Sequence, residues 1–169
     1  MKGPEQIRKG CERPVRIPLS VLAERYGDKV YAAAFSVCRN LHDAQDIAQE
    51  TFLSYHTTKK EFASEEHILA WLLRVAVNKS KNLCRSAHKQ RDLPLEDWEQ
   101  TLVFAEAADR ELFQAVLALP EPYRVVLHLH YYEGYSVKEI AKLLRVGESA
   151  VKQRLARARA QLKEFYQED

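Results

Sequence analysis

The chain has 169 residues, of which 46% are hydrophobic and 30% are charged. This length suits one ordinary domain or two small ones, and this composition argues against a chain that is disordered throughout. Glycine and proline occur only five and six times, which favours long helices over the many turns of a β-sandwich or β-barrel.

The net charge of +2 conceals an uneven distribution of charge. The charged residues of segment 71–91 are all basic, those of segment 96–111 are acidic except Arg110, and those of segment 150–163 are basic again. Two basic blocks around an acidic segment indicate two nucleic-acid contacts and a spacer. The competing interpretation is that each basic block is an ordinary solvated helix face.

The cysteines are Cys11, Cys38 and Cys84, which are widely spaced and form no Cys-x-x-Cys pair. This pattern argues against a disulfide scaffold or a zinc finger and fits a reducing cytoplasm. Residues 1–18 are basic and polar, so we expect a mobile tail and no secretory signal. The apolar stretch 68–77 is too short to span a membrane.

Apolar residues at spacings of three and four predict a first helix from about Ser20 to Asn40. A second helix is expected to begin near Asp43, a residue type favoured at helix N-caps. Its apolar residues include Ile47 and Phe52, and its acidic and amide side chains fall mostly on the other side.

A third helix is predicted over about 65–90, with Ser64 as its cap. The apolar residues expected on one face are Leu69, Leu72, Val75, Ala76 and Leu83. The residues that step by four and three along the opposite face are Arg74, Asn78, Lys81, Arg85 and His88. An apolar back with a basic front is typical of a helix that lies on a phosphate backbone.

Residues 92–105 lack a clean period, contain Pro94 and are acidic, so we expect a linker that stays off DNA. A second domain is expected from residue 106, with one helix that ends at Pro120. Pro122 is suited to the start of the next helix, which should end near Gly134.

Residues 136–163 predict a helix-turn-helix. Ser136 and Glu139 form a capping box, residues 145–147 form a turn, and the second helix is basic. The side chains expected on or beside its outer face are Ser149, Lys152, Gln153, Ala156, Arg157 and Ala160. Small and amide groups can approach base edges while lysine and arginine hold phosphates. The alternative is an ordinary helical hairpin with a basic exterior.

No arrangement of residues indicates an enzyme. The six histidines are scattered, and the chain has no glycine-rich phosphate loop. Asp43, Asp46 and Glu50 share one helix face and could hold a cation, but their polar neighbours favour a protein-binding surface. We therefore expect no catalytic residues, no metal site, no cofactor and no small-molecule substrate.

Three groups of residues, in order along the chain, carry a family resemblance. Residues 43–52 (DAQDIAQETF) resemble region 2.2, and residues 71–78 (WLLRVAVN) resemble regions 2.3 to 2.4, of extracytoplasmic-function sigma factors in the sigma-70 superfamily. The segments that resemble region 4 of that family are 119–124, 131–136, 139–141 and 151–159. The resemblance runs from about Ser20 to Lys163.

The resemblance implies a transcription initiation factor that is all-α, with two small helical domains joined by a flexible acidic linker. The implied boundaries are residues 1–18 for the tail, 19–91 for region 2, 92–105 for the linker and 106–169 for region 4. The implied partners are core RNA polymerase, through the clamp helices of its largest subunit and the flap of its second-largest subunit, promoter DNA, and an anti-sigma factor. The implied location is the bacterial cytoplasm, at the nucleoid when the protein is active or at the membrane when an anti-sigma factor sequesters it.

The resemblance also assigns residues to roles. Those implied to bind core polymerase are Asp43, Asp46, Gln49, Glu50 and Phe52. Those implied to hold the minus-ten element are Arg74, Asn78, Lys81, Arg85 and His88. Those implied to read the minus-thirty-five element are Ser149, Lys152, Gln153, Arg154 and Arg157. A loop at residues 62–66, beside Asn78, is expected to accept a flipped base.

The chain departs from the family pattern at several positions. Asn82 stands where aspartate is frequent, Arg145 where glycine is usual, and Gly147 where a capping serine is usual. Because the last two positions precede the reading helix, the promoter sequence does not follow from the resemblance.

The sequence leaves two other functions open. A stand-alone helix-turn-helix regulator would explain residues 136–163 but not the acidic second helix or the basic third helix. A protein-binding adaptor would explain neither basic block. Affinity for duplex DNA without polymerase separates a regulator, which binds a specific site unaided, from a sigma factor of this kind, which binds duplex weakly.

Overall fold

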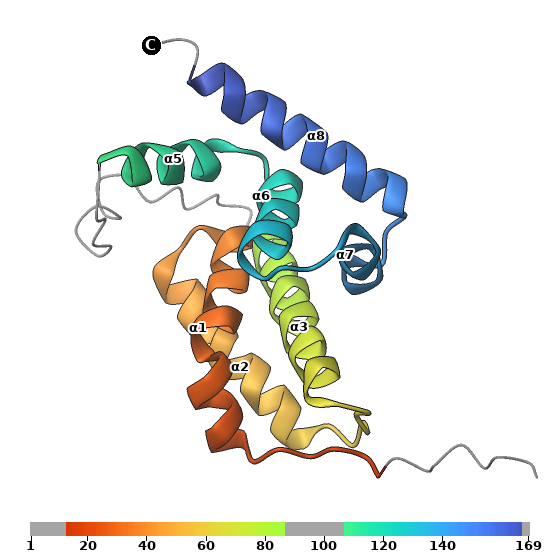
Figure 1. Ribbon diagram of the computed structural model, residues 1–169. Helices are drawn as coiled ribbons and strands as arrows, with labels where there is room; N and C mark the ends of the chain where they lie inside the picture. Colours follow the sequence, from red (N-terminus) through yellow and green to blue (C-terminus); the bar gives the residue numbers. More distant parts are fainter. Residues whose placement is uncertain (1–12, 87–106, 167–169) are drawn as a thin grey trace, which may run out of the picture.

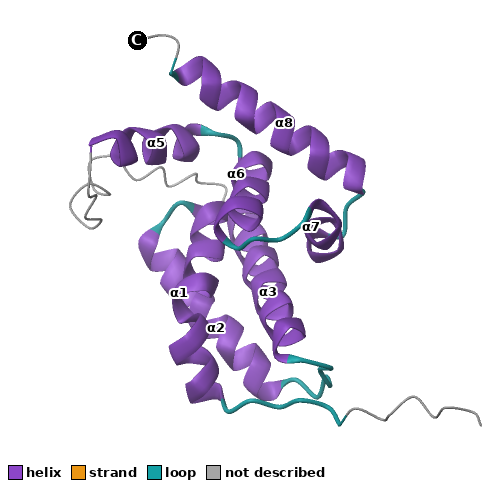
Figure 2. Ribbon diagram, in the orientation of Figure 1, coloured by secondary structure: helices purple, strands orange, loops and turns teal. Residues whose placement is uncertain are grey.

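The computed structural model describes residues 13–86 and 107–166, and this part of the chain is helical without a β-strand (Figures 1 and 2). The N-terminal bundle comprises α1 (Leu19–Cys38), α2 (Leu41–Thr57) and α3 (Glu65–Ser86). The C-terminal bundle comprises α5 (Ala107–Ala118), α6 (Glu121–Leu127), the π-helical turn η1 (His128–Tyr132), α7 (Val137–Leu144) and α8 (Glu148–Phe165). The all-α prediction is confirmed, whereas the linker 92–105 lies outside the described residues.

The boundary between α1 and α2 differs from the prediction. Arg39 takes a left-handed backbone conformation with φ of 52° and ends α1, and the buried Asn40 caps α2. The Asn40 side chain accepts a hydrogen bond of 3.0 Å from the backbone N–H of Asp43. The prediction that Asp43 is the N-cap is therefore wrong, because the chain reverses within two residues and α2 begins earlier.

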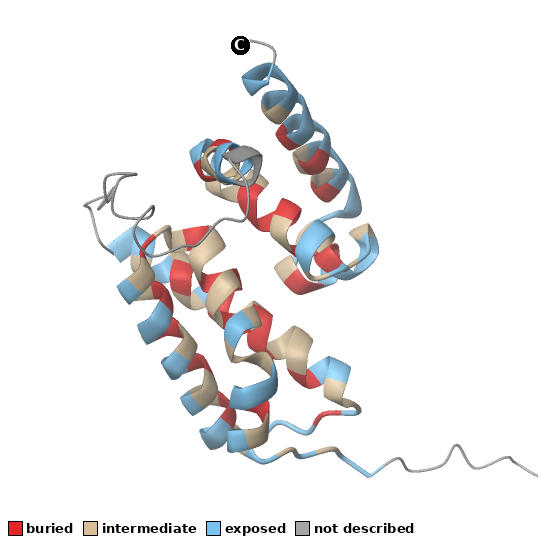
Figure 3. Cartoon of the chain, turned by 60° about the vertical axis from the view of Figure 1, so that its left-hand side comes forward, coloured by how far each residue is buried: buried red, intermediate tan, exposed pale blue. Residues whose placement is uncertain are grey.

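The core of the N-terminal bundle is formed by all three of its helices and the segment that precedes α3. Tyr55, Phe62 and Trp71 pack as an aromatic cluster with ring centroids 5.6 to 6.4 Å apart. The buried apolar residues of this core are Leu22, Val30, Ala34, Ala44, Ile47, Tyr55, Phe62, Ile68, Leu72 and Ala76. In Figure 3, the buried residues, coloured red, lie mainly on the inner faces of the helices.

Residues 15–17 are fixed against this bundle. The Ile17 backbone exchanges two hydrogen bonds of 3.0 Å with the Tyr55 hydroxyl. Arg16 donates to the carbonyl oxygens of Tyr55 and Thr58 at 2.7 and 3.1 Å, and its guanidinium lies over the Tyr55 ring. The mobile tail predicted for residues 1–18 is therefore wrong for these three residues, because long-range contacts hold them; residues 1–12 lie outside the described part.

The C-terminal bundle is organised around α6. Its first turn begins after Pro120 and contains Pro122, as the sequence predicted. The chain continues through the π-helical turn and leaves it at Gly134, whose φ of 74° favours glycine. The apolar face of α8 packs on α6 and α7, and that of α7 packs on α8 and η1.

The two bundles share one apolar core. Ala33 and Val37 of α1 and Leu73 and Val77 of α3 are all buried in the cluster that also contains Leu129. This C-terminal cluster lies over the C-terminal halves of α1 and α3, with α7 beside α3 (Figure 1). The apolar face predicted for α3 is therefore too narrow. Leu72 and Ala76 are buried as expected, but the C-terminal bundle also buries a second side of α3, at Leu73 and Val77.

Candidate nucleic-acid interface

The helix-turn-helix prediction is confirmed in its local geometry. The Ser136 hydroxyl accepts from the Glu139 backbone N–H at 3.3 Å, and the Glu139 carboxylate accepts from the Ser136 backbone N–H at 2.8 Å. The hydrogen bond from the Ser136 backbone N–H is the main reason why the pKa of Glu139 lies below its usual value, and the Ser136 side chain adds to this effect. Arg145, with φ of 56°, ends α7, and Gly147 stands at the N-cap of α8.

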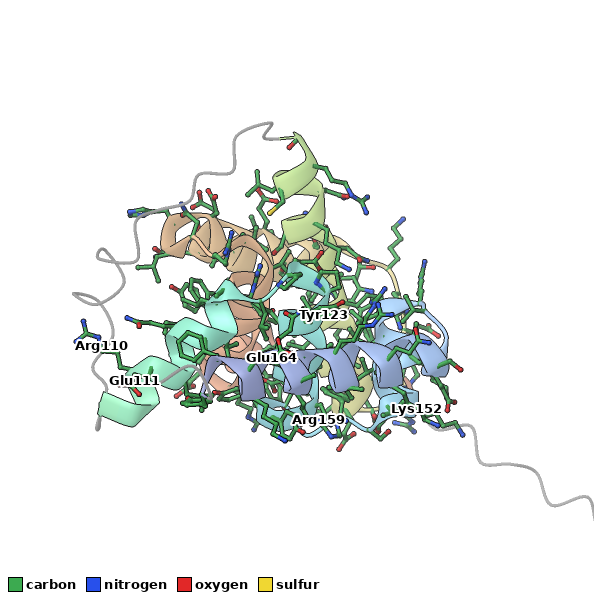
Figure 4. All side chains as sticks on the ribbon, turned by 90° about the horizontal axis from the view of Figure 1, so that it is seen from above. Arg110, Glu111, Tyr123, Lys152, Arg159 and Glu164 are labelled. Carbon is green, nitrogen blue, oxygen red and sulfur yellow. The ribbon has the colours of Figure 1, made fainter. Side chains whose placement is uncertain are left out.

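The outer face of α8 is open to solvent in the described structure. Val151, Leu155 and Ala158 are buried against α6 and α7. The exposed residues among those predicted to contact DNA are Ser149, Lys152, Gln153 and Arg157, and Arg154 is half-buried. Figure 4 looks down on α8 and shows Lys152 and Arg159 along one edge of it, where Arg159 donates to the Tyr131 hydroxyl at 3.2 Å.

The strained turn residue gives a testable consequence. A non-glycine residue in the left-handed region costs about 1 kcal/mol or more, of which part is offset by the greater unfolded-state entropy of glycine. We expect Arg145→Gly to raise the free energy of unfolding by about 0.5 kcal/mol. Urea denaturation measures this change. The control is Ala160→Gly at an exposed position of α8, which should lower the free energy of unfolding by about 1 kcal/mol. If Arg145→Gly lowered the free energy of unfolding, the backbone of Arg145 would not be strained.

Four of the residues predicted for the basic face of α3 lie in the described structure, and two of these four contact the C-terminal bundle. Asn78 and Arg85 are exposed. Arg74 donates to the carbonyl oxygens of Leu143 and Lys142 at 3.0 and 3.1 Å. The Lys81 ammonium lies 3.4 Å from the Glu121 carboxylate. His88 lies outside the described residues.

The acidic face of α2 is separate from both basic surfaces. Asp46, Gln49 and Glu50 are exposed, whereas Asp43 and Phe52 are half-buried. The Glu50 carboxylate lies 3.3 Å from the Lys79 ammonium, an exposed pair that contributes little to stability. The face therefore presents carboxylate and amide groups to solvent, which suits a basic partner surface.

The loop predicted to accept a flipped base does not lie beside Asn78. Residue 65 begins α3, and the helix rises 1.5 Å per residue, so Asn78 is about 20 Å further along the axis. Phe62 is buried in the aromatic cluster, and the Ser64 hydroxyl accepts from the His67 backbone N–H at 3.3 Å. The placement of this loop next to Asn78 is therefore wrong, because the N-terminal half of α3 separates the two.

Sequence reasoning missed the role of Arg124. This residue is buried, and its guanidinium donates to the carbonyl oxygens of Ser36 and Val37 at 2.8 and 3.0 Å and also to that of Leu119. Burial, together with the nearby charge of Arg39, lowers the pKa of Arg124 to about 10, so it stays protonated at neutral pH. A single arginine within the apolar run 123–127 was the available signal.

Comparisons with known proteins address both bundles. The family model for sigma-70 region 2 matches residues 22–90, and that for sigma-70 region 4 matches residues 109–162. The ECF RNA polymerase sigma factor SigM of Mycobacterium tuberculosis is 30% identical, over 87% of this chain and 76% of the relative. The chain belongs to the sigma-70 family. It is a transcription initiation factor of the extracytoplasmic-function type.

Other relatives agree with this membership. The ECF sigma factor SigW of Bacillus subtilis is 27% identical, over 94% of this chain and 92% of the relative. The sigma factor RpoE of Bartonella quintana, in a co-crystal structure with the anti-sigma factor NepR, superposes with a TM-score of 0.68 over 89% of this chain and 97% of that one, at 19% identity. That likeness shows the fold. Hereafter the N-terminal bundle is region 2 and the C-terminal bundle is region 4.

Within residues 13–86 and 107–166, no helix is both long and apolar enough to cross a membrane. In the same part of the chain, no three histidine, cysteine or acidic side chains are grouped as a metal ion would require.

Proposed function

We propose that this sigma factor uses three separate surfaces: α2 for core polymerase, α3 for the minus-ten element and α8 for the minus-thirty-five element. The observation that carries the proposal is their separation. The three faces belong to different helices: the face of α2 is acidic, and the faces of α3 and α8 are basic.

The polymerase surface is the acidic face of α2, where Asp46, Gln49 and Glu50 are exposed. Its proposed target is the clamp helices of the largest subunit, and region 4 meets the flap of the second-largest subunit. Opposite charges on the two partners accelerate docking and orient it. Asp43 and Phe52 are half-buried, so we propose that they support the exposed residues of this face and contact the polymerase less.

The minus-thirty-five surface is the outer face of α8 at its N-terminal end. Ser149 and Gln153 offer a small hydroxyl and an amide to base edges, and Lys152, Arg154 and Arg157 flank them as phosphate contacts. A helix of this length enters the major groove with its first turns. The base that the Gln153 amide contacts, adenine or another, determines which minus-thirty-five sequence is preferred.

The minus-ten surface is the basic face of α3, formed by Arg74, Asn78, Lys81 and Arg85. Arginine and lysine hold phosphates of the separated strand, and the Asn78 amide contacts a base. We also propose that the protein acts without a catalytic group of its own, in the cytoplasm and at the nucleoid, and that an anti-sigma factor can bind it, as NepR binds RpoE in the co-crystal structure.

The minus-ten assignment predicts a defect in promoter melting. We expect Arg74→Ala with Arg85→Ala to slow open-complex formation by roughly tenfold or more, because each lost charge-assisted contact is worth at least 1 kcal/mol. Permanganate footprinting of the melted strand measures this rate. Arg85→Ala alone, which leaves the Arg74 contacts to α7 intact, should give part of the defect.

The matched control is Lys79→Ala, on the same helix but paired with Glu50 of α2. This variant should melt the promoter at the wild-type rate, and all variants should bind core polymerase within about twofold of wild type. Unchanged melting in the double variant would remove α3 from the minus-ten site.

The remaining alternative is a stand-alone regulator that uses α8 alone. It predicts tight binding of the free protein to a specific duplex site, at the nanomolar level typical of such regulators. Fluorescence anisotropy with the mapped promoter duplex separates the two. We expect weak binding by the free chain and tight binding only with polymerase present.

A further inference from the structure

Residues 15–17, here called the strap, hold the C-terminal end of α2. The Arg16 guanidinium donates to the carbonyl oxygens of Tyr55, His56 and Thr58 at 2.7, 3.3 and 3.1 Å. These oxygens belong to the last turn of α2 and its C-cap, where they have no intrahelical donor and the helix dipole is negative. The guanidinium also lies 4.5 Å from the centroid of the Tyr55 ring. A single side chain therefore satisfies the end of this helix.

The strap also reaches the loop that follows α2, residues 58–62. The Val15 backbone N–H donates to the Phe62 carbonyl oxygen at 2.7 Å in an isolated β-bridge. Phe62 is itself buried in the aromatic cluster of the bundle. In Figure 1, the segment before α1 and the connection between α2 and α3 lie at the same end of the bundle. The loop is therefore held at both ends, by Arg16 at residue 58 and by Val15 at residue 62.

Two lysines occupy the middle of this loop. Lys59 and Lys60 are exposed, and the Lys60 ammonium lies 5.8 Å from the centroid of the Phe62 ring. Glu61 follows them and is exposed as well, so two lysines and one glutamate give the loop a net charge of +1. Arg16 adds a further positive charge beside it. Lysine ammonium groups bind phosphate as point charges, so this loop suits a phosphate backbone.

The loop is in line with the basic face of α3. His67 is exposed and precedes Arg74 by seven residues, about two helical turns, so both project from the same face. The helix rises about 14 Å between Glu65, its first residue, and Arg74. This rise corresponds to about four nucleotides at the ~3.4 Å spacing of a duplex strand. A strand held by α3 therefore reaches Lys59 and Lys60 within a few nucleotides.

We infer that the strap is a positioning element for DNA binding, which holds the loop 58–62 so that Lys59 and Lys60 contact phosphates of the promoter strand beside the minus-ten segment. Arg16 is its positioning residue, because its guanidinium is directed at carbonyl oxygens and acts through the loop. A loop that is fixed before binding loses less conformational entropy on contact. The inference rests on the proposed role of α3 at the minus-ten element.

The loop contact is tested with holoenzyme assembled from the full chain and core polymerase. Fluorescence anisotropy measures its affinity for two single-stranded oligonucleotides: the minus-ten segment of a promoter mapped with this chain, and the same segment extended by six nucleotides at each end. We expect Lys59→Ala with Lys60→Ala to weaken binding of the long oligonucleotide about tenfold and of the short one less than about twofold. The slope of log affinity against log salt concentration should fall by about 1.4 for the long oligonucleotide, as for two lost phosphate contacts on a single strand.

Glu61→Gln is the control of opposite sign in the same loop. It removes the negative charge next to the two lysines and leaves the strap contacts in place. It should tighten binding of the long oligonucleotide about twofold. Weaker binding by this variant would contradict a phosphate contact at the loop.

Arg16→Lys separates positioning from charge. Lysine keeps the positive charge but lacks the planar fork that reaches several carbonyl oxygens. We expect this variant to weaken binding of the long oligonucleotide about threefold and to speed amide hydrogen exchange in residues 58–62 about tenfold. Arg13→Ala removes an exposed charge three residues earlier and should change neither value by more than about 1.5-fold.

Tyr55→Phe loosens the strap without any change in charge. It removes the hydroxyl that exchanges two hydrogen bonds with the Ile17 backbone, so exchange and binding should change in the same directions as in Arg16→Lys. The control for stability is Ile68→Val, which shortens a buried residue of the same bundle. That variant should bind the long oligonucleotide as wild type does.

The outcomes separate the inference from its premise. Wild-type binding by the Lys59→Ala and Lys60→Ala double variant, while Arg85→Ala weakens binding of both oligonucleotides, would overturn the loop contact alone. Wild-type exchange and binding by Arg16→Lys would overturn the positioning role of the strap. If Arg85→Ala changed neither oligonucleotide, the minus-ten role of α3 would be wrong, and the inference would fail with it.

Discussion

Replacement of Arg124 by methionine is expected to lower the free energy of unfolding by about 3 kcal/mol or more. Arg124 is 4% exposed, and its guanidinium donates to three carbonyl oxygens, those of Ser36, Val37 and Leu119. Methionine can fill much of the same volume but donates no hydrogen bond. Each buried carbonyl left without a donor costs about 1–3 kcal/mol, so loss of packing is the smaller part of the effect.

Urea denaturation followed by circular dichroism measures this loss. The matched control is Arg25→Met, which removes an arginine whose side chain is 55% exposed and which pairs with Glu65 at the surface. That variant should change the free energy of unfolding by less than about 1 kcal/mol. An Arg124→Met variant as stable as the Arg25→Met variant would show that water replaces the guanidinium at these carbonyls.

The second large effect is expected at the polymerase surface. Asp46→Lys with Glu50→Lys should weaken binding to core polymerase by at least about a hundredfold, since two attractive contacts become repulsive. Both side chains are exposed and lie one helical turn apart, so the fold should survive. Loss of the Glu50 pair with Lys79 costs little because that pair is exposed. Biolayer interferometry with immobilised core enzyme measures the affinity.

The chain offers a close control for this variant. Glu24 and Asp28 of α1 are exposed, carry the same charges and have the same spacing of four residues. Glu24→Lys with Asp28→Lys therefore makes the same change in net charge at another surface and should bind polymerase as wild type does, within about threefold. Equal loss in the two variants would point to net charge rather than to the face of α2.

Local features of this fold followed from the sequence because they depend on neighbouring residues. The Ser136 capping box, the turn at Arg145 and the buried face of α8 each arise within a few residues of chain. The two basic surfaces and the acidic one followed in the same way, since helical spacing decides which side chains share a face.

Contacts between distant segments could not be predicted in this way. The hydrogen bonds of Arg124 to α1 and of Arg74 to α7 join residues 68 to 88 positions apart. Periodicity identifies an apolar face but not the element that covers it. Leu73 and Val77 broaden the apolar surface of α3, and this breadth was the one local sign that α3 packs on two sides.

The same limit explains the anchoring of residues 15–17. The segment is short and carries Pro14 and Pro18, so it has no helical pattern of its own. Its order comes from the Tyr55 hydroxyl and from carbonyl oxygens at the end of α2. Such order depends on the folded bundle and leaves no periodic signal in the sequence.

Run-off transcription tests the central claim most directly. The purified chain is mixed with core polymerase from a related bacterium and a genomic fragment library, and transcript starts are mapped by sequencing. The account predicts discrete starts that require the chain, share two upstream motifs at a fixed spacing, and disappear with Asp46→Lys and Glu50→Lys. Absence of chain-dependent transcripts, together with tight binding of the free chain to duplex DNA, would contradict it.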